Sequence, residues 1–139
     1  MSLGMSWLGV DAALAALAKK AAEVDVVSRQ VVTKSAAVVI RAAQANFEGA
    51  HKKGEPHVGG SLPNVVTGTL RRSIVMSKVT RNGVGDFSSS VGPTAVYGRA
   101  VELGLRNGAS YPYFSPAVTA TRSQVQAVAV ATWRAWLLK

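Results

Sequence analysis

Few side chains in this chain of 139 residues could do catalytic chemistry, and they are widely spaced. The seven acidic residues are Asp11, Glu23, Asp25, Glu48, Glu55, Asp86 and Glu102. Acid–base catalysis needs two such groups in one pocket. Glu23 and Asp25 are two apart on an expected helix, so they do not face each other. No phosphate-binding loop of the GxxxxGK[ST] or GxGxxG kind is present. The pattern argues against an enzyme.

The two histidines, His51 and His57, flank Glu55 in a stretch rich in glycine and proline. A metal site needs a third and a fourth ligand at fixed spacing, and the sequence offers none here. The absence of cysteine excludes thiolate sites and disulfides. We therefore expect two exposed loop histidines, with no metal and no cofactor.

Glu102 is the carboxylate that most needs an explanation. It lies in VGPTAVYGRAVELG, between a glycine-proline pair and Gly104. An enzyme would use such a residue as a catalytic carboxylate. An assembly protein would use it as a charged partner at the end of a helix.

Basic residues outnumber acidic ones by sixteen to seven, which gives a formal net charge of +9. Such a charge favours an acidic partner, either a nucleic acid, an anionic membrane or an acidic protein surface. Aromatic and basic side chains alternate around Glu102: Arg71, Arg72, Tyr97, Arg99, Arg106, Tyr111, Tyr113 and Phe114. This set could stack on bases, or it could form a small core with arginines on its rim. Tyrosine and arginine are also typical of protein interfaces. We favour a protein interface, because nothing in the set resembles a known base-stacking module.

Trp133 and Trp136 lie three residues apart near the C-terminus, beside Arg134 and Lys139. They could anchor a helix at a membrane surface or belong to a helix end that faces the core or a neighbouring subunit. We favour the second interpretation, because the rest of that segment is rich in alanine and weakly charged. No run of about 18 apolar residues exists, so no membrane-spanning helix is expected.

Two segments have the apolar spacing of amphipathic helices. Residues 12–48 contain no glycine or proline, and Asp11 and Gly49 are the expected N-cap and stop. A helix of that length spans roughly 55 Å at 1.5 Å per residue. This exceeds the width of a small domain, so part of it should project and pack on another subunit. The second helix is expected at residues 116–138, with Ser115 as its N-cap and Pro116 in its first turn.

The middle of the chain predicts a loop and a β-hairpin. Residues 49–68 form a long flexible loop by composition. Residues 69–80 and 84–91 are the expected strands, joined by a turn at Arg81, Asn82 and Gly83. A lone hairpin is not stable, so it should pair with other strands or lie on the long helix. Gly92 and Pro93 should end the second strand, and residues 95–103 should form a short helix that Gly104 stops.

The expected architecture is a single α+β domain over residues 11–139, preceded by an N-terminal arm at residues 1–10. The long N-terminal helix and the C-terminal helix pack on a small, mostly antiparallel β-sheet. Hydrophobic residues make up 48% of the chain but aromatic residues only 6%, so the core should be thin. Stability should then depend on contacts with neighbouring subunits.

Three motifs in a fixed order resemble the small tail-component family of long-tailed double-stranded DNA phages, whose members act at the neck as tail-completion or tail-terminator proteins. The first motif is GTLRRSI, with Gly68, Leu70, Ser73 and Ile74. The second is VGPTAVYGRAVELG, with Val91, Gly92, Tyr97, Val101, Glu102 and Gly104. The third is YPYFSPA, with Pro112, Phe114, Pro116 and Ala117. The resemblance spans about residues 12–138.

The resemblance implies a structural protein of the virion, assembled in the host cytoplasm, without enzymatic activity and without a membrane partner. Copies of the chain would form a ring of six or twelve that stacks on the connector and on the tail tube. Duplex DNA would pass through the ring without specific binding. The alternative is a basic nucleic-acid-binding protein.

The resemblance also implies a role for Glu102, as the partner of an arginine within the chain or across a subunit contact. The candidate arginines are Arg71, Arg72 and Arg99. The residues expected at interfaces or in structural roles are Arg71, Arg72, Tyr97, Arg99, Glu102, Gly104, Phe114, Trp133 and Trp136.

Overall fold

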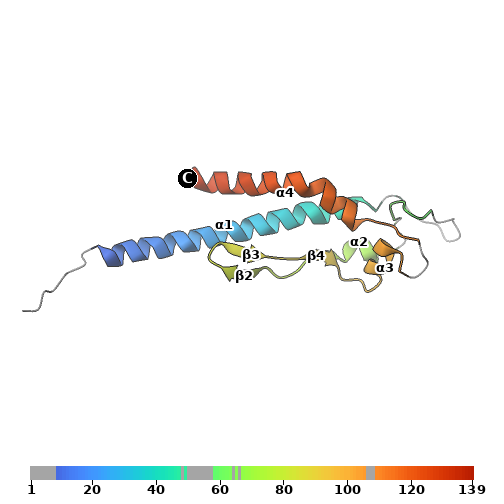
Figure 1. The fold of residues 1–139 in the computed structure, drawn as a ribbon, viewed down its shortest axis with the longest axis horizontal. Coiled ribbons are helices and arrows are strands. Elements are labelled where there is room, and N and C mark those ends of the chain that lie inside the picture. The colour runs from blue at the N-terminus through green and yellow to red at the C-terminus, as the bar shows by residue number, and fades with distance from the viewer. Residues whose placement is uncertain (1–8, 48, 50–57, 64, 66, 106–108) are drawn as a thin grey trace, which may run out of the picture.

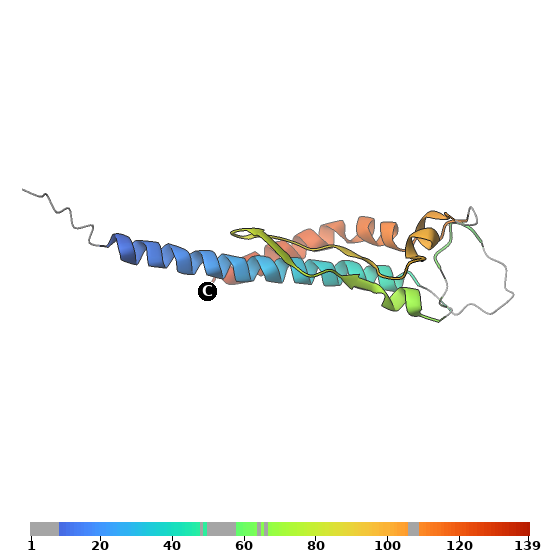
Figure 2. The same cartoon turned by 90° about the horizontal axis from the view of Figure 1, so that it is seen from below.

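The computed structural model describes residues 9–47, 49, 58–63, 65, 67–105 and 109–139. The described elements form three layers (Figures 1 and 2). Helix α1 (Val10–Ala45) runs through the middle, helix α4 (Phe114–Leu137) lies on one side of it, and a β-ribbon lies on the other. The expected α+β class, with two long helices and a small antiparallel β-region, is confirmed.

Helix α1 is unbroken for 36 residues, as the lack of glycine and proline predicts. Its ends differ from the prediction. The N-cap is Gly9, and Asp11 lies in the first turn, where a negative charge favours the helix dipole. The helix stops at Ala45, before Gly49, because Phe47 turns into the core and is 7% exposed.

The β-ribbon consists of two antiparallel pairs. Strand β1 (Ile74–Met76) pairs with β4 (Val91–Pro93), and β2 (Thr80–Gly83) pairs with β3 (Asp86–Ser88). Between the pairs, serines replace the regular backbone pattern: the Ser90 amide donates to Ser77 Oγ at 2.9 Å, and Ser89 Oγ donates to the Ser77 carbonyl at 2.9 Å. The ribbon lies along α1, so the expected hairpin on the long helix is confirmed.

Several boundaries predicted for this region are wrong. The first expected strand begins with a helical turn, α2 (Thr69–Arg72), which follows Gly68 in the left-handed region at φ 73°. Arg81, Asn82 and Gly83 belong to β2, and the turn comes at residues 84–85. Gly92 and Pro93 do not end the strand, because both pair with β1.

Gly85 is the turn residue that the structure requires. Its φ is +70°, and a Cβ at this position would lie 2.9 Å from Val24 Cγ1 of α1. Only glycine combines this backbone conformation with this closeness to the helix. The ribbon therefore reaches its tip directly over the second quarter of α1.

Two further helix starts are corrected. Helix α3 (Gly98–Leu103) begins three residues after the expected position, since residues 95–97 form a turn, and it ends as predicted at Gly104, with φ 70°. Helix α4 begins at Phe114, with Tyr113 at the N-cap position. Ser115 lies inside the first turn and is not the cap.

The core is small and lies at one end of the molecule. It joins the end of α1 to the start of α4 and to the α2–β1 segment, through Ala43, Phe47, Leu70, Ile74, Tyr113 and Ala117. Among the described residues, eight hydrophobic side chains are buried, whereas fifteen large ones are exposed.

Candidate functional site

The Glu102 junction is the most connected polar feature of the described chain. We use this name for the Glu102 carboxylate and the first amides of α4 that donate to it. Glu102 Oε2 accepts from the backbone amides of Tyr113 at 2.8 Å and Phe114 at 3.0 Å. Glu102 Oε1 accepts from the Ser115 amide at 2.9 Å and the Ser115 hydroxyl at 2.6 Å. A carboxylate from α3 thus caps the N-terminus of α4.

The electrostatics of the junction agree with this geometry. Partial burial alone would raise the pKa of Glu102. The hydrogen bonds from the Ser115 hydroxyl and from the three amides outweigh that effect, so the pKa of Glu102 lies below its ordinary value. The carboxylate is therefore charged at neutral pH. It meets the positive end of the dipole of a 24-residue helix, which further stabilises the charged form.

Within the described chain, the partners of Glu102 are the amides of Tyr113, Phe114 and Ser115 and the Ser115 hydroxyl, and not Arg71, Arg72 or Arg99; a pairing with an arginine across a subunit contact stays a prediction. Arg71 and Arg72 are exposed on α2, and Arg99 is exposed on α3. Arg72 Nη2 donates to the Thr67 carbonyl at 3.2 Å. Because helix amides satisfy both carboxylate oxygens, Glu102 acts within the fold, and these three arginines keep their charges at the surface.

Tyr113 fixes the other side of the junction. Its side chain is 1% exposed, its ring centroid lies 4.9 Å from that of Phe47, and its hydroxyl donates to the Gly98 carbonyl at 3.2 Å. Asn46 Nδ2 donates to the Tyr113 carbonyl at 2.7 Å. Burial, and then the nearby Glu102 charge, raise the pKa of Tyr113 to about 12. The phenol is therefore a neutral structural donor that links α1, α3 and α4.

Gly98 allows α3 to approach the ribbon. A Cβ on Gly98 would lie 2.7 Å from both Cβ and Cγ of Pro93, and 3.1 Å from Leu70 Cδ1. Real Cβ atoms do not come this close to a proline ring, so a larger residue would push α3 away from β4. Gly98 was not among the residues that sequence analysis proposed as sites, although it lies in the second motif. Tyr113 was named only in the aromatic and basic set for which a protein interface was favoured, whereas the structure buries it in the core.

A second polar contact holds the tip of the ribbon on α1. Asp25 Oδ1 accepts from the Gly85 amide at 2.7 Å, and Asp25 Oδ2 pairs with Arg81 Nε at 2.8 Å. These contacts, led by the Gly85 amide, hold the pKa of Asp25 below its ordinary value. Next to them, the Arg29 guanidinium lies 5.3 Å from the centre of the Phe87 ring. Asp25 of α1 thus serves packing within the chain.

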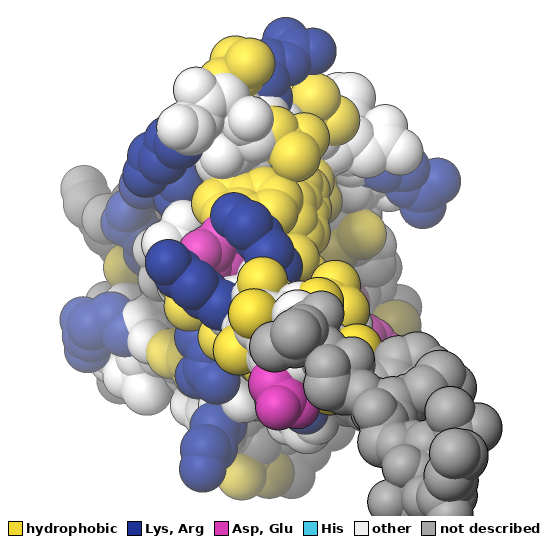
Figure 3. Space-filling view, turned by 90° about the vertical axis from the view of Figure 1, so that its left-hand side faces the viewer, with side chains coloured by type: hydrophobic (Ala, Val, Ile, Leu, Met, Phe, Trp, Pro, Cys, Tyr) yellow, Lys and Arg dark blue, Asp and Glu magenta, His cyan; other side chains and the backbone are white. Residues whose placement is uncertain are grey.

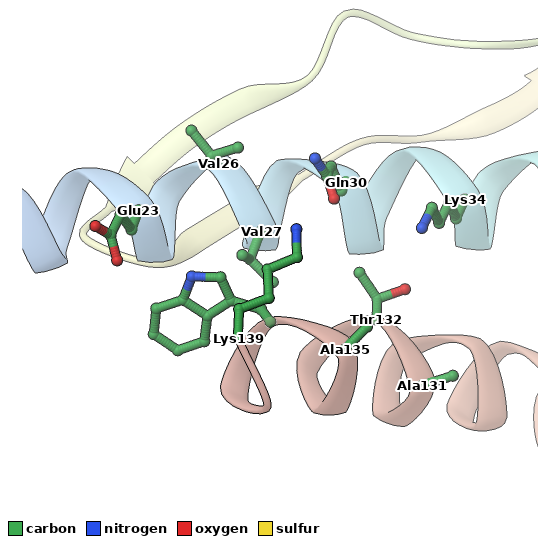
Figure 4. Close-up of a pocket in the computed structure, with 10 residues that line it drawn as sticks. Glu23, Val26, Val27, Gln30, Lys34, Ala131, Thr132, Ala135 and Lys139 are labelled. Atoms are coloured by element: carbon green, nitrogen blue, oxygen red, sulfur yellow. The ribbon is translucent and has the colours of Figure 1, made fainter.

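The two tryptophans lie at the end of α4, next to α1. Their ring centroids are 5.8 Å apart in an edge-to-face arrangement, and the Lys20 ammonium lies 5.8 Å from the Trp136 ring. Trp136 borders a groove of about 490 Å³ between α1 and α4, where Glu23, Lys34 and Lys139 lie around an apolar floor (Figure 4).

The first three turns of α1 project beyond both α4 and the ribbon (Figures 1 and 2). Every residue from 9 to 20 is exposed, including Leu14 at 58% and Leu17 at 66%. Viewed onto this end, apolar side chains lie between lysine and arginine side chains (Figure 3). The projecting part of α1 that the sequence predicts is therefore present.

Several expected features lie outside the described residues or find no counterpart within them. His51, Glu55 and His57 lie outside the described ranges, as does most of the first half of the expected 49–68 loop. Within the described part of the chain, no group of three acidic, histidine or cysteine side chains could hold a metal ion. None of the described helices is long and apolar enough to cross a membrane.

Comparison with known proteins gives one family. The family model described as "Bacteriophage HK97-gp10, putative tail-component" matches residues 11–104, which is more than half of the chain. The match includes α1, the ribbon and α3, together with Glu102 and Gly104. No curated protein and no solved structure matches the chain.

Proposed function

Because the chain belongs to the HK97 gp10 family of bacteriophage tail components, we propose that it is a structural protein of the head–tail junction that acts by self-assembly. In this proposal, copies of the chain form a closed ring of six or twelve. The ring stacks on the connector at one face and on the tail tube at the other. It completes or terminates the tail, and the chain has no catalytic role.

The observation that carries this proposal is the distribution of apolar surface. Val10, Leu14 and Leu17 are exposed on α1, and Val130 and Leu137 are exposed on α4. Large apolar surfaces on soluble proteins mark contacts with other chains. The small core lies at the opposite end, around the Glu102 junction. Other exposed apolar side chains, such as Val96, Leu103 and Leu105, lie near that core. Apolar surface is thus exposed at both ends of the described part of the molecule, which fits a subunit with more than one neighbour.

The charge of the chain suggests where its partners bind. Among the described residues, ion pairs join Lys20 to Glu23 and Arg81 to Asp25. Exposed cations such as Arg71, Arg99 and Arg122 are therefore available to a partner. A channel that passes DNA should not grip it, so we place these cations on the outer or stacking surfaces. There they would meet acidic partner proteins and speed docking.

The net charge of +9 also supports a second candidate, a basic nucleic-acid-binding protein. The two candidates differ in how binding responds to salt. A protein that neutralises several phosphates loses affinity steeply as salt concentration rises. The proposal of a passive channel predicts no tight binding to duplex DNA at physiological salt.

The experiment that tests the proposed location is immunogold electron microscopy on particles of the phage that encodes the chain. Antibodies against the purified protein should label the junction between head and tail. Labelling along the tail tube or at its distal tip would refute a role at the junction. Particles without label, from a preparation in which mass spectrometry finds no copy of the chain, would refute a role in the virion.

A further inference from the structure

Helix α3 has two sides with different surroundings. Gly98 and Glu102, four residues apart, face the fold: Gly98 is buried against Pro93, and Glu102 caps α4. Arg99 and Leu103, also four residues apart, lie on another side of the helix and are exposed. Residues four apart are neighbours on a helix surface. The outward side of α3 therefore carries a cationic and an apolar side chain next to each other.

Apolar side chains continue this surface at both ends of α3. Val96, in the turn before the helix, is 99% exposed, and Leu105, after it, is 63% exposed. The Leu105 amide donates to the Ala100 carbonyl at 3.3 Å, a bond that often follows a left-handed glycine at a helix end. Helix α3 lies at the end of the molecule opposite the start of α1 (Figure 1). We use the name α3 patch for Val96, Tyr97, Arg99, Leu103 and Leu105.

The α3 patch is fixed in place, because the inward side of α3 is bonded to the start of α4 and to the segment before it. The Glu102 carboxylate accepts from the first amides of α4. The Tyr113 hydroxyl donates to the Gly98 carbonyl at 3.2 Å, and the Tyr111 amide donates to the Val101 carbonyl at 2.8 Å. A surface that is ordered beforehand loses less entropy when a partner binds. The α3 patch is therefore suited to docking.

A slot beside the α3 patch adds a concave element. It has a volume of about 160 Å³ and lies between α2 and α3, with Phe47, Leu70 and Val101 among its walls. Tyr97 and Arg71 also line it, so the slot and the patch adjoin. Such a slot can accept one apolar side chain of a partner protein, and tyrosine and arginine are frequent at these anchor points. A lipid surface or the sugar–phosphate backbone of DNA has no side chain to fill it.

The charges near the slot argue against a second copy of this chain as its partner. Arg71 and Arg99 are exposed, and neither takes part in an ion pair among the described residues. Of the five acidic residues in the described ranges, three are bound by a cation or by helix amides. The other two, Asp11 and Asp86, lie at the start of α1 and in the ribbon. A second copy would therefore bring many cations and few carboxylates to the patch.

We propose that the α3 patch and the adjoining slot are the docking site for a different protein of the particle, one that presents carboxylates around an exposed apolar side chain. The apolar side chain enters the slot, and the carboxylates meet Arg71 and Arg99. The inference rests on the proposed function, because it assigns a surface and a partner chemistry to one contact of the head–tail junction. That partner is a protein other than this chain.

The test is restoration of infectivity in vitro. The gene is deleted from the phage that encodes the chain, and a lysate of infected cells supplies the separate heads and tails. Purified wild-type protein added to this lysate should restore infectious particles, counted as plaques, and negative-stain images should show heads joined to tails. The measured quantity is the protein concentration that gives half of the maximal plaque count.

Val96→Gln and Leu103→Gln remove apolar contacts without adding a charge. Because both side chains are exposed, thermal unfolding of the protein should not change. Each variant should need about tenfold more protein than the wild type, the loss expected for an interface anchor. Arg99→Glu should need still more, whereas Arg99→Lys, which keeps the charge, should need less than Arg99→Glu. The matched control is Val84→Gln, an exposed valine in the turn of the ribbon, and it should act like the wild type.

A cross-link identifies the partner. The chain contains no cysteine, so Leu103→Cys can be labelled with a benzophenone maleimide at that position alone. Irradiation of the restored particles, followed by mass spectrometry, should place the cross-link on another protein of the particle, next to acidic residues. A cross-link to a second copy of this chain, or a lower oligomer mass for Val96→Gln, would make the patch a contact between copies and overturn the inference.

The remaining outcomes separate this inference from the proposed function. Joined particles in the untreated lysate, or a wild-type protein that restores none, would refute the role at the junction. If Val96→Gln and Leu103→Gln restore infectivity as well as the wild type does, the docking site is refuted and the role at the junction stands. Loss confined to Arg99→Glu, together with tight binding of the wild type to duplex DNA, would assign the cations to nucleic acid. Binding to vesicles of anionic phospholipid that Val96→Gln abolishes would assign the patch to a membrane. Both results would overturn the inference.

Discussion

Replacement of Glu102 by alanine should destabilise the monomer fold. The variant removes the acceptor of three amides and one hydroxyl at the start of α4. Loss of a helix cap costs about 0.5–2 kcal/mol, and a buried donor left without a partner costs about 1–3 kcal/mol. The junction is only partly buried, so water will replace some of these bonds. We expect a loss of about 2–3 kcal/mol in the free energy of unfolding.

The assay is urea unfolding followed by circular dichroism at pH 7, at a salt concentration where the wild type has one oligomeric state. Glu102→Gln keeps an acceptor oxygen and loses the charge, so it should cost about 1 kcal/mol, the scale of a charge at a helix terminus. Arg71→Ala and Arg99→Ala serve as controls and should change the free energy of unfolding by less than about 0.5 kcal/mol.

The result that would refute this reasoning is a Glu102→Ala variant as stable as the wild type. A different failure would be equally informative. If Arg99→Ala or Arg71→Ala cost as much as Glu102→Ala, an arginine pair would hold the carboxylate, and the amides would not be its main partners. The geometry of the junction predicts neither result.

The contacts of the described chain give three further expected outcomes. Gly98→Ala should lower the free energy of unfolding by about 1–3 kcal/mol, the usual cost of overpacking. The added Cβ would lie 2.7 Å from the ring of Pro93. Thermal unfolding of the variant and the wild type measures this loss. Asp25→Asn should speed hydrogen exchange at the Gly85 amide, measured by NMR, while core amides stay protected. The pKa of Glu102 in the folded state lies below its unfolded value of about 4.5. The stability that charged Glu102 contributes is therefore present above that value and is lost as pH falls through the folded pKa. On acidification, the free energy of unfolding should fall more for the wild type than for Glu102→Gln.

The long helices could be predicted from the sequence because their signals are local. Residues 12–45 contain no helix breaker, and their apolar spacing continues for many turns, so α1 could be placed to within three residues at each end. The ribbon was harder to place. Residues 69–72 carry no helical repeat long enough to detect, and Gly68 and Gly85 give the same turn signal as Gly83.

The role of Glu102 could be predicted only in part. Its position at the end of a short helix before Gly104 indicated a structural role. Its true partners lie eleven to thirteen residues later, and no local spacing rule links them. The chain after α3 returns to place the start of α4 over the carboxylate. That approach depends on tertiary packing around Tyr113 and Gly98, which a pattern of residue types does not contain.

The central claim, that the chain is a subunit of a self-assembled ring, is tested most directly by light scattering on the purified protein, with negative-stain images of the same fractions. The account predicts a single mass of six or twelve copies and closed rings with a central channel. A monomer that binds duplex DNA tightly at physiological salt would contradict it and favour the nucleic-acid-binding alternative.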